Sequence, residues 1–241
     1  MGKRIISQRR GRGTSTYKAP SFRYKGMVSH RTYDDTEKTG VMKGKVLDII
    51  HCPGHSAPLA VIEYENKERI LVLARNGMNT KEEVQSGNLA ELNAGNTLPL
   101  GKLDVGTQIY NIEKSVGDGG KFVKAAGGSA RIVAKGKTTV RIRFASKKQM
   151  DIHSTCRATI GTIASGGKSE KPFVKAGVKF YKMKARNKLW PKTSGVAMNS
   201  VDHPFGSGRG RHIGKSKIAP RNAPPGRKVG TIKPRRVGKR K

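Results

Sequence analysis

The clearest pattern of hydrophobic and polar positions lies in the segment TTVRIRF. There Val140, Ile142 and Phe144 alternate with Arg141 and Arg143. A period of two predicts a β-strand that buries the apolar set on one face and presents both arginines on the other. The segment SARIVA precedes it across the short turn KGK, so the two segments predict a β-hairpin. The arginine face is either an ordinary solvated face or a surface that meets phosphates.

Earlier segments also predict strands. Residues 40–51 mix aliphatic and β-branched residues with spaced lysines, and residues 57–74 hold two apolar runs around ENKE, which is the pattern of a hairpin. TKEEVQSGN could form one helical turn, and CRATIGTIA (156–164) is expected to close the last domain with a short turn of helix. The predicted fold class is all-β, with two small barrels over residues 34–80 and 81–170.

The charge of the chain is very uneven. It carries 50 Lys and Arg against 16 Asp and Glu, a formal net charge of +34. Residues 1–33 hold nine basic residues and no acid, residues 171–241 hold 21 basic residues and one acid, and residues 34–170 carry a net charge of only +5. Such a chain repels itself unless an anion surrounds it, and the phosphates of nucleic acid supply that charge. The ends are therefore predicted to be basic extensions that bind nucleic acid.

Other classes of protein fit the composition poorly. No apolar run approaches the roughly 20 residues that span a bilayer, and the basic start of the chain lacks the apolar region of a secretory signal. The two cysteines, Cys52 and Cys156, indicate a reducing compartment better than a disulfide framework. We therefore expect no membrane partner.

The far C-terminal segment RNAPPGRKVGTIKPRRVGKRK is rich in Pro, Gly, Lys and Arg. It cannot bury enough apolar surface to offset its chain entropy. It is either a solubilising tail or an arm that becomes ordered on nucleic acid, and the single sign of its charge favours the arm. We expect both extensions to be disordered in the free protein.

One pair of residues raises the question of catalysis. Asp202 and His203 adjoin each other in GVAMNSVDHPFGSGRGRH, but a catalytic base needs a carboxylate hydrogen-bonded to its ring. Pro204 pushes His203 toward an extended conformation, in which neighbouring side chains point to opposite sides. The pair is therefore expected not to act as base and orienting acid, and the chain is not expected to be an enzyme.

Two further motifs carry little specific chemistry. His51, Cys52 and His55 in HCPGH are candidate metal ligands, but a closed zinc site needs four, so we expect neither a metal nor any other cofactor. The run HPFGSGRGRHIG matches neither a P-loop nor a dinucleotide fingerprint. Its glycines and arginines suit irregular RNA, and the aromatic content of 5% favours recognition of structured RNA by shape over base stacking.

Several of these stretches together resemble a known family. GVAMNSVDHPFGSGRGRHIGK, AGNTLPLGKLDVGT, GGSARIVAKG, CRATIG and the basic RGRG start are similar to the universal large-subunit ribosomal protein number two, over nearly the whole chain. HPFG and RHIGK resemble the archaeal and eukaryotic-cytosolic branch, and the short N-terminus suggests an archaeal member. HCPGH departs from the family pattern, so no family role is carried onto it.

The resemblance implies an OB-like barrel, then an SH3-like barrel, then an extension that threads into rRNA, with long basic extensions at both ends. It also implies a cytoplasmic, ribosomal location, with large-subunit rRNA, neighbouring ribosomal proteins and the small subunit as partners. The implied roles are assembly, subunit association, tRNA binding and support of the peptidyl-transferase centre. A DNA-packaging protein and a metal-dependent enzyme remain the alternatives.

Specific residues are expected to carry this function within a contact loop over residues 195–215. The residues expected near the peptidyl-transferase centre are Met198, Asn199, Asp202, His203, Pro204, Gly206 and Gly208. The residues expected to bind RNA are Arg9, Arg10, Arg12, Arg141, Arg143, Arg157, Arg209, Arg211, His212, Lys215, Arg235 and Arg236.

Overall fold

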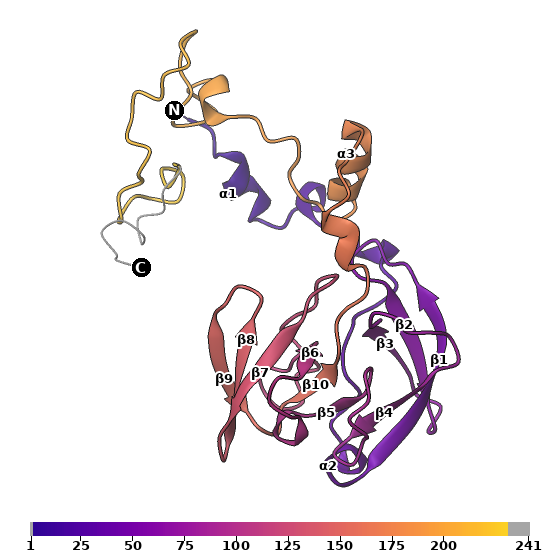
Figure 1. The fold of residues 1–241 in the computed structure, drawn as a ribbon. Coiled ribbons are helices and arrows are strands. Elements are labelled where there is room, and N and C mark those ends of the chain that lie inside the picture. The colour runs from indigo at the N-terminus through magenta and orange to yellow at the C-terminus, as the bar shows by residue number, and fades with distance from the viewer. Residues whose placement is uncertain (1, 231–241) are drawn as a thin grey trace. The chain divides into compact units, whose positions relative to one another are not determined.

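The computed structural model describes residues 2–230, and the chain divides into two compact units (Figure 1). The first, here called the β unit, comprises Ser21–Val174. The second, here called the arm unit, combines Met1–Pro20 with Lys175–Lys241, so it joins the two ends of the chain. Within residues 2–230, no helix has the length and apolar character that a membrane span requires.

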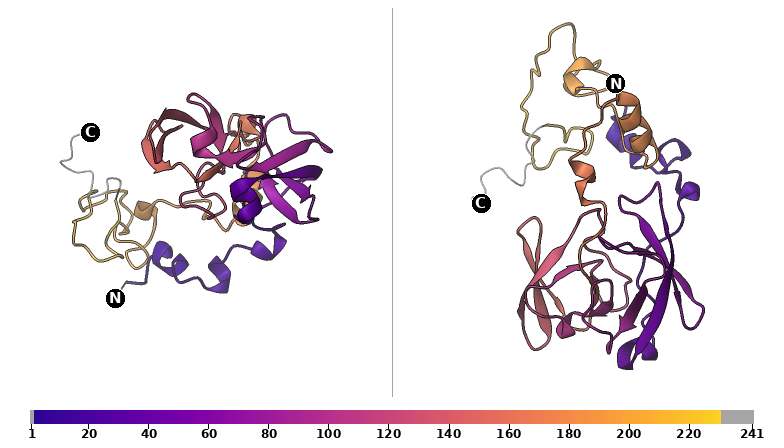
Figure 2. Two further views of the ribbon diagram at one scale, coloured as in Figure 1. Left: turned by 90° about the horizontal axis from the view of Figure 1, so that it is seen from below. Right: turned by 45° about the vertical axis from the view of Figure 1, so that its right-hand side comes forward.

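One ten-stranded sheet builds the β unit. Its strands are β1 (Val41–Ile50), β2 (Leu59–Tyr64), β3 (Arg69–Leu73), β4 (Glu83–Gly87), β5 (Thr97–Pro99), β6 (Gln108–Tyr110), β7 (Ala130–Lys135), β8 (Thr139–Phe144), β9 (Gln149–His153) and β10 (Arg157–Ile160). In space they follow the order β3-β2-β1-β4-β5-β10-β6-β7-β8-β9. The sheet folds into two lobes, one of β1–β4 and one of β6–β9 (Figures 1 and 2). The expectation of an all-β fold is confirmed.

Most predicted strands form where the pattern placed them. Strand β1 and the hairpin β2–β3 cover the first two predicted segments, and β7–β8 form the predicted second hairpin. TKEEVQSGN was expected to form a helical turn, and this prediction is wrong. Its residues form β4, which pairs with β1 and turns Val84 and Ser86 into the core, so pairing with the sheet outweighs local helix propensity. The domain boundary after residue 80 stays a prediction; it falls just before this strand.

The last strand of the sheet lies at its centre. CRATIGTIA was expected to contain a short turn of helix, but its residues form β10, which is hydrogen-bonded to β5 on one side and β6 on the other. All four residues of β10 are buried. A strand with neighbours on both edges and cover on both faces reads as a continuous buried run, which the sequence pattern does not distinguish from a helical turn.

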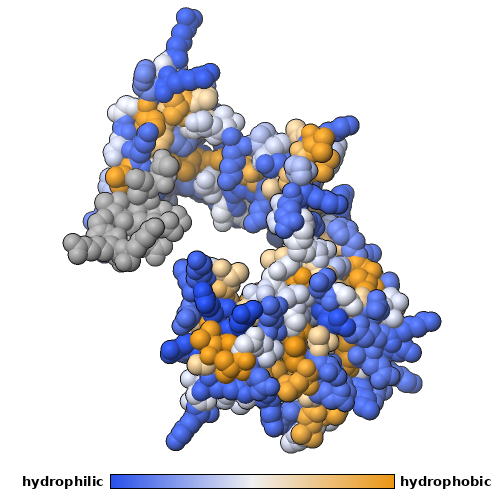
Figure 3. Space-filling model, in the orientation of Figure 1, coloured by the Kyte–Doolittle hydropathy of each residue, from blue (hydrophilic) through white to orange (hydrophobic). Residues whose placement is uncertain are grey.

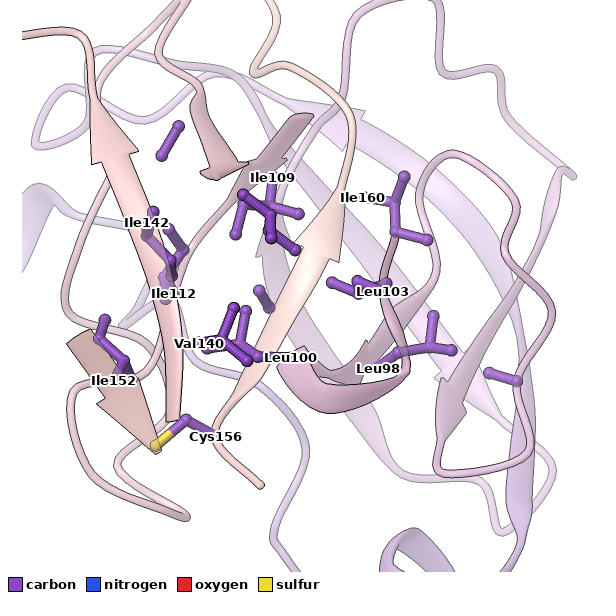
Figure 4. Close-up of a cluster of buried hydrophobic side chains, with 14 residues drawn as sticks. Leu98, Leu100, Leu103, Ile109, Ile112, Val140, Ile142, Ile152, Cys156 and Ile160 are labelled. Atoms are coloured by element: carbon purple, nitrogen blue, oxygen red, sulfur yellow. The ribbon is translucent and has the colours of Figure 1, made fainter. Parts of the chain in front are cut away.

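Each lobe has its own apolar core. The larger core, in the second lobe, gathers 14 buried residues (Figure 4), including Leu98, Ile109, Val140, Ile142 and Ile160. A second cluster fills the first lobe, around the residues Val46, Ile62 and Val84. A third cluster contains residues of both lobes, among them Leu59, Leu73 and Tyr110. In it the Tyr110 hydroxyl donates to the Leu73 carbonyl at 3.2 Å.

The segment before β1 packs into the β unit instead of extending from it. Sequence analysis assigned residues 1–33 to a basic extension, but Val28, His30 and Arg31 are buried. The chain then enters the short helix α2 (Asp35–Thr39), which the Asp34 side chain caps by accepting from the Glu37 amide at 3.0 Å. The extension predicted at the N-terminus therefore ends near residue 20 in the structure.

A network of buried charges fixes this segment to the second lobe. Arg157, at the start of β10, is only 1% exposed, and its guanidinium donates to both Glu113 and Glu37, with Nη2–Oε1 and Nη1–Oε2 distances of 2.9 and 3.2 Å. Arg31 pairs in turn with Asp34 and with Glu68, where Nε lies 3.1 Å from Oε2. Burial raises the pKa of Glu37, and burial also opposes charge on Arg157, but the contacts with Glu113 and Glu37 raise the Arg157 pKa.

Glu113 is fully satisfied by this arrangement. Its carboxylate accepts from the Arg157 guanidinium and from the Arg157 backbone amide at 2.9 Å, and also from the Gly119 amide at 3.2 Å. The Glu113 amide returns a hydrogen bond to the Arg157 carbonyl at 3.0 Å. A buried ion pair contributes stability only when its remaining donors and acceptors are also paired, which is the case for Glu113.

The arm unit contains short helices and irregular chain. Its elements are α1 (Ile6–Arg10), η1 (Ser15–Tyr17), α3 (Ala176–Lys184) and η5 (Gly195–Ala197). Two contacts join the ends of the chain inside it: the Lys3 amide donates to the Val201 carbonyl at 2.8 Å, and the Arg10 guanidinium donates to the Asn187 carbonyl. The expected disorder of the free extensions stays a prediction.

Replacing Arg157 with Met should lower the free energy of unfolding by about 3–5 kcal/mol, because two carboxylates would remain buried without their cation. The control is Arg141→Met, which removes an exposed ion pair with Asp151 and should cost about 1 kcal/mol or less. Urea unfolding of the full chain at pH 7 measures both. A similar small loss in the two variants would contradict a stabilising role for the buried network.

His30 should make stability depend on pH. Burial and the nearby Arg157 lower its pKa to about 4, and its ring Nε2 lies 2.5 Å from the Asn111 carbonyl oxygen. The unfolded chain, with a histidine pKa of about 6.5, therefore binds more protons between pH 6.5 and 4, so stability falls as pH drops through that range, by about 2 kcal/mol at pH 5.

His30→Gln should remove this part of the pH dependence, because glutamine does not titrate. Urea unfolding at pH 7, 6 and 5 measures it, with the exposed His212→Gln as control. Neighbouring Glu113, Lys124 and Arg157 are unchanged in both variants. Parallel pH curves for the wild type and His30→Gln would contradict the assignment.

Candidate nucleic-acid interface

The loop that carries Asp202 and His203 is a compact turn. The amides of both residues donate to the Asn199 carbonyl, at 3.0 and 3.2 Å, and the Gly206 amide donates to the His203 carbonyl at 2.9 Å. His203 begins the turn that this last bond closes, with Pro204 as its second residue. The extended backbone expected for His203 stays a prediction. The case against a catalytic pair rests on contacts, because within residues 2–230 no hydrogen bond or ion pair joins the Asp202 carboxylate to the His203 ring.

His203 is held by its own loop. Its ring Nδ1 accepts from the Phe205 amide at 3.0 Å, and its ring lies 5.3 Å from that of the buried Phe205. Burial lowers the pKa of His203, which keeps the ring neutral at pH 7. Because Nδ1 accepts, the proton of the neutral ring lies on Nε2. The ring therefore offers one N–H donor to a ligand and has no carboxylate to activate it as a base.

Two glycines allow this turn to close. A Cβ on Gly195 would lie 2.3 Å from the His203 ring, and a Cβ on Gly206 would lie 2.3 Å from the Asn199 carbonyl oxygen. Both separations are shorter than van der Waals contact permits, so only glycine fits either position. Gly208 has a different role, because its φ of +40° favours glycine although nothing lies within 4 Å. Met198 and Pro204 are half-buried in the turn, and Asn199 is exposed.

A hollow of about 700 Å³ adjoins the turn. Residues of the N-terminal segment, including Ile5 and Arg9, line it together with Lys192, Asp202 and His203. His203 also lines a second hollow, of about 570 Å³, with Pro225 and Lys228. Residues far apart in the sequence thus surround one histidine with several cations and a single carboxylate.

The basic residues predicted to bind RNA in the arm unit are mostly free to do so. The exposed ones are Arg9, Arg12, Arg209, Arg211, His212 and Lys215. Arg10 is half-buried, and its guanidinium lies 5.5 Å from the Tyr17 ring centre. Hydrophilic residues cover much of the visible face of each unit (Figure 3). Arg235 and Arg236 lie outside the described residues.

The three arginines predicted in the β unit have different environments. Arg143 is exposed on β8, and Arg141 is exposed but bound to Asp151, with Nε–Oδ1 and Nη2–Oδ2 distances of 2.8 and 3.1 Å. Arg157 is buried in the ion network with Glu113 and Glu37. Its assignment to RNA binding is therefore wrong, because its guanidinium is hydrogen-bonded to two buried carboxylates and is inaccessible to solvent.

The HCPGH motif gives no metal site in the structure. Cys52 is fully buried, with Sγ 3.1 Å from the His55 Nδ1, and His51 is exposed. Among residues 2–230, no group of three or more His, Cys, Asp or Glu side chains is placed to hold a metal ion. Cys52 and Cys156 are both free thiols.

Comparison with known proteins identifies the family. The model of the RNA binding N-terminal domain of ribosomal proteins L2 matches residues 2–86, and that of the C-terminal domain of ribosomal proteins L2 matches residues 93–223. The chain belongs to the ribosomal protein L2 family. The two matched domains, with the strands described above, make the β unit of this L2 protein an OB-like barrel followed by an SH3-like barrel.

Archaeal relatives match the chain along its whole length. The large ribosomal subunit protein uL2 of Methanococcus maripaludis is 50% identical over 242 residues, covering 100% of both chains. The uL2 of Haloarcula marismortui is 49% identical, covering 99% of this chain and 98% of its own, and that of Methanocaldococcus jannaschii is 48% identical, covering 100% of both. This L2 family member is thus of the archaeal type.

Sequence reasoning missed several residues at the candidate interface. Lys192 and Lys228 line the two hollows beside His203, and Lys3 binds the loop at Val201 through its backbone amide. The shared sign of charge at both ends of the chain was the one available signal. It predicted a common polyanionic partner but gave no indication that the two ends contact each other.

Gly195→Ala should displace His203 from its turn, because the new Cβ would overlap the imidazole. The freed ring becomes more solvated, so its pKa should rise toward about 6.5. An NMR pH titration of the His203 ring signals measures this. Gly177→Ala, in α3 with open space around it, is the matched control and should leave the titration unchanged. An unchanged His203 pKa in Gly195→Ala would contradict the described packing.

Proposed function

We propose that this protein is a structural constituent of the large ribosomal subunit that binds rRNA through its arm unit and the outer face of its β unit. The observation that carries the proposal is the arm unit's set of exposed cations around the His203 turn, with Asp202 as the one acid of residues 171–241. The matched family and the relatives support it, since these relatives are large ribosomal subunit proteins and the matched N-terminal domain is described as RNA binding.

The binding mode follows from the chemistry of the exposed groups. Arg9, Arg12, Arg209 and Arg211 present guanidinium groups, which match phosphate oxygens in pairs. The glycine-rich loop lets backbone approach the ligand closely, and the neutral His203 ring supplies a single directed donor. Such a set fits an irregular RNA surface, where shape and backbone contacts dominate recognition.

The family resemblance also suggests finer roles for the protein. We propose that it supports assembly, subunit association, tRNA binding and the peptidyl-transferase centre by holding rRNA in shape, in the cytoplasmic ribosome, beside neighbouring ribosomal proteins and with a contact to the small subunit. The protein itself performs no catalysis in this proposal, because His203 lacks an orienting carboxylate and the hollow beside it holds no second acid among the described residues.

The proposal is tested by competition between two nucleic acids. The full chain should bind purified large-subunit rRNA of Methanococcus maripaludis in preference to duplex DNA of the same length. Between about 50 and 200 mM salt, its affinity should fall by orders of magnitude, because bound cations displace counterions from phosphates. Fluorescence anisotropy or filter binding over this range gives the slope of log affinity against log salt. Equal affinity for DNA would favour a DNA-packaging protein instead.

Arg209→Gln/Arg211→Gln should reduce that salt slope by about 1.4 to 1.8, since each phosphate contact contributes about 0.7 to 0.9. The matched control, Lys67→Gln/Lys81→Gln, removes the same charge from exposed positions of the β unit. An identical slope for the variant and the control would show that the loop contributes only general charge.

A further inference from the structure

A row of four polar side chains crosses the second lobe of the β unit from strand to strand. Gln108 of β6 lies opposite Arg131 of β7, Arg131 lies opposite Arg143 of β8, and Arg143 lies opposite Gln149 of β9. All four residues are exposed. Sequence analysis selected Arg143 alone from this row, because only the register of the three strand pairs brings the others beside it.

The two central residues of the row have the same charge. Like charges directly opposite on adjacent strands destabilise a sheet, because neighbouring strands are only about 4.8 Å apart. The row contains no carboxylate, and no ion pair of Arg131 or Arg143 occurs within residues 2–230. The free protein therefore holds an uncompensated pair of cations at fixed positions.

The next row along the same strands shows the contrast. There Arg141 lies opposite Asp151 of β9 and binds it through two hydrogen bonds. An arginine on this sheet is thus neutralised where the protein supplies a partner. The Arg131–Arg143 pair has no such partner. Carboxylates at the two flanking positions would relieve the repulsion, but these positions hold the neutral amides of Gln108 and Gln149.

We propose that the Gln108–Arg131–Arg143–Gln149 row is a binding site for a phosphodiester group of rRNA. Two guanidinium groups side by side supply paired donors to the oxygens of a phosphate, and the flanking amides supply further neutral donors. A bound phosphate neutralises the two arginines. The repulsion that destabilises the free sheet is therefore relieved on binding, and this relief adds to the binding free energy. Arg141 is excluded from the site by its bond to Asp151.

This inference rests on the proposed function. The proposed site lies on packed strands, which distinguishes it from the His203 loop. The site lies on β6–β9, whose inward residues Ile109, Ile132 and Ile142 are packed in the larger core. The backbone of a site built on packed strands is positioned before the ligand arrives, so binding there orders side chains but not backbone.

The test uses the full chain and purified large-subunit rRNA of Methanococcus maripaludis. Arg131→Gln/Arg143→Gln should weaken binding at least tenfold and reduce the slope of log affinity against log salt by about 1.4 to 1.8. Lys147→Gln/Lys148→Gln, in the turn between β8 and β9, removes the same charge from the same hairpin. This control should weaken binding less than about threefold, as expected for loss of general attraction.

A second variant separates binding from folding. Arg131→Glu places opposite charges across β7 and β8, so it should raise the urea midpoint of the free protein while it abolishes the contribution of the row to rRNA binding. Modification by phenylglyoxal, which reacts with accessible arginines, should in wild type be blocked by rRNA at Arg131 and Arg143.

Three results would overturn the inference while leaving the proposed function intact. The first is equal rRNA binding by Arg131→Gln/Arg143→Gln and the lysine control. The second is undiminished phenylglyoxal reaction of both arginines in the rRNA complex. The third is loss of stability in Arg131→Glu, which would show that the arginine pair serves the fold. Absence of rRNA binding by the wild type would instead overturn the proposed function itself.

Discussion

The β unit depends on the ion pairs that Arg157 makes with Glu113 and Glu37. These pairs are closed to solvent, and they join three parts of the chain: helix α2, the segment after β6, and the start of β10. The Tyr33 ring, 5.0 Å from the Arg157 guanidinium carbon, completes the enclosure. Few alternative arrangements are possible for charges buried at this depth. Any arrangement that breaks one of the pairs leaves an unpaired ion in a medium of low dielectric, which is energetically costly. The network therefore selects one placement of the segment before β1, including helix α2, within the β unit.

Arginines that look alike in the sequence serve opposite purposes in the structure. The alternation in TTVRIRF correctly placed Arg141 and Arg143 on the outer face of a strand, since a period of two depends only on local geometry. It could not show that Asp151 neutralises one of them and Arg131 opposes the other, because strand register is set by the whole sheet. The burial of Arg157 was equally hidden, since its partners Glu113 and Glu37 lie 44 and 120 residues away.

For the arm unit, the composition predicted the lack of an apolar core but not the contacts between the two ends of the chain. Composition alone indicated that these segments lack the apolar residues for a core, and α3 indeed buries none of its residues. The turn around His203 is specified more closely, by the steric need for glycine at Gly195 and Gly206. Those contacts form within the loop itself, between residues seven or eight positions apart in the sequence. The pairing of Lys3 with Val201 has no such local signal, so only the folded chain reveals it.

The central position of β10 governs the order in which this protein can fold during synthesis. Strands β5 and β6 emerge early but do not pair with each other, since Thr159 of β10 binds Thr97 of β5 and Tyr110 of β6. Until residue 160 leaves the ribosome, the sheet exists as two separate halves, each with an open edge that another chain can join. Arg157 arrives with the same strand, so its ion pairs with Glu37 and Glu113 cannot form until then. We therefore expect the β unit to complete its sheet and pair its buried charges in one late step, before the C-terminal part of the arm unit is synthesised.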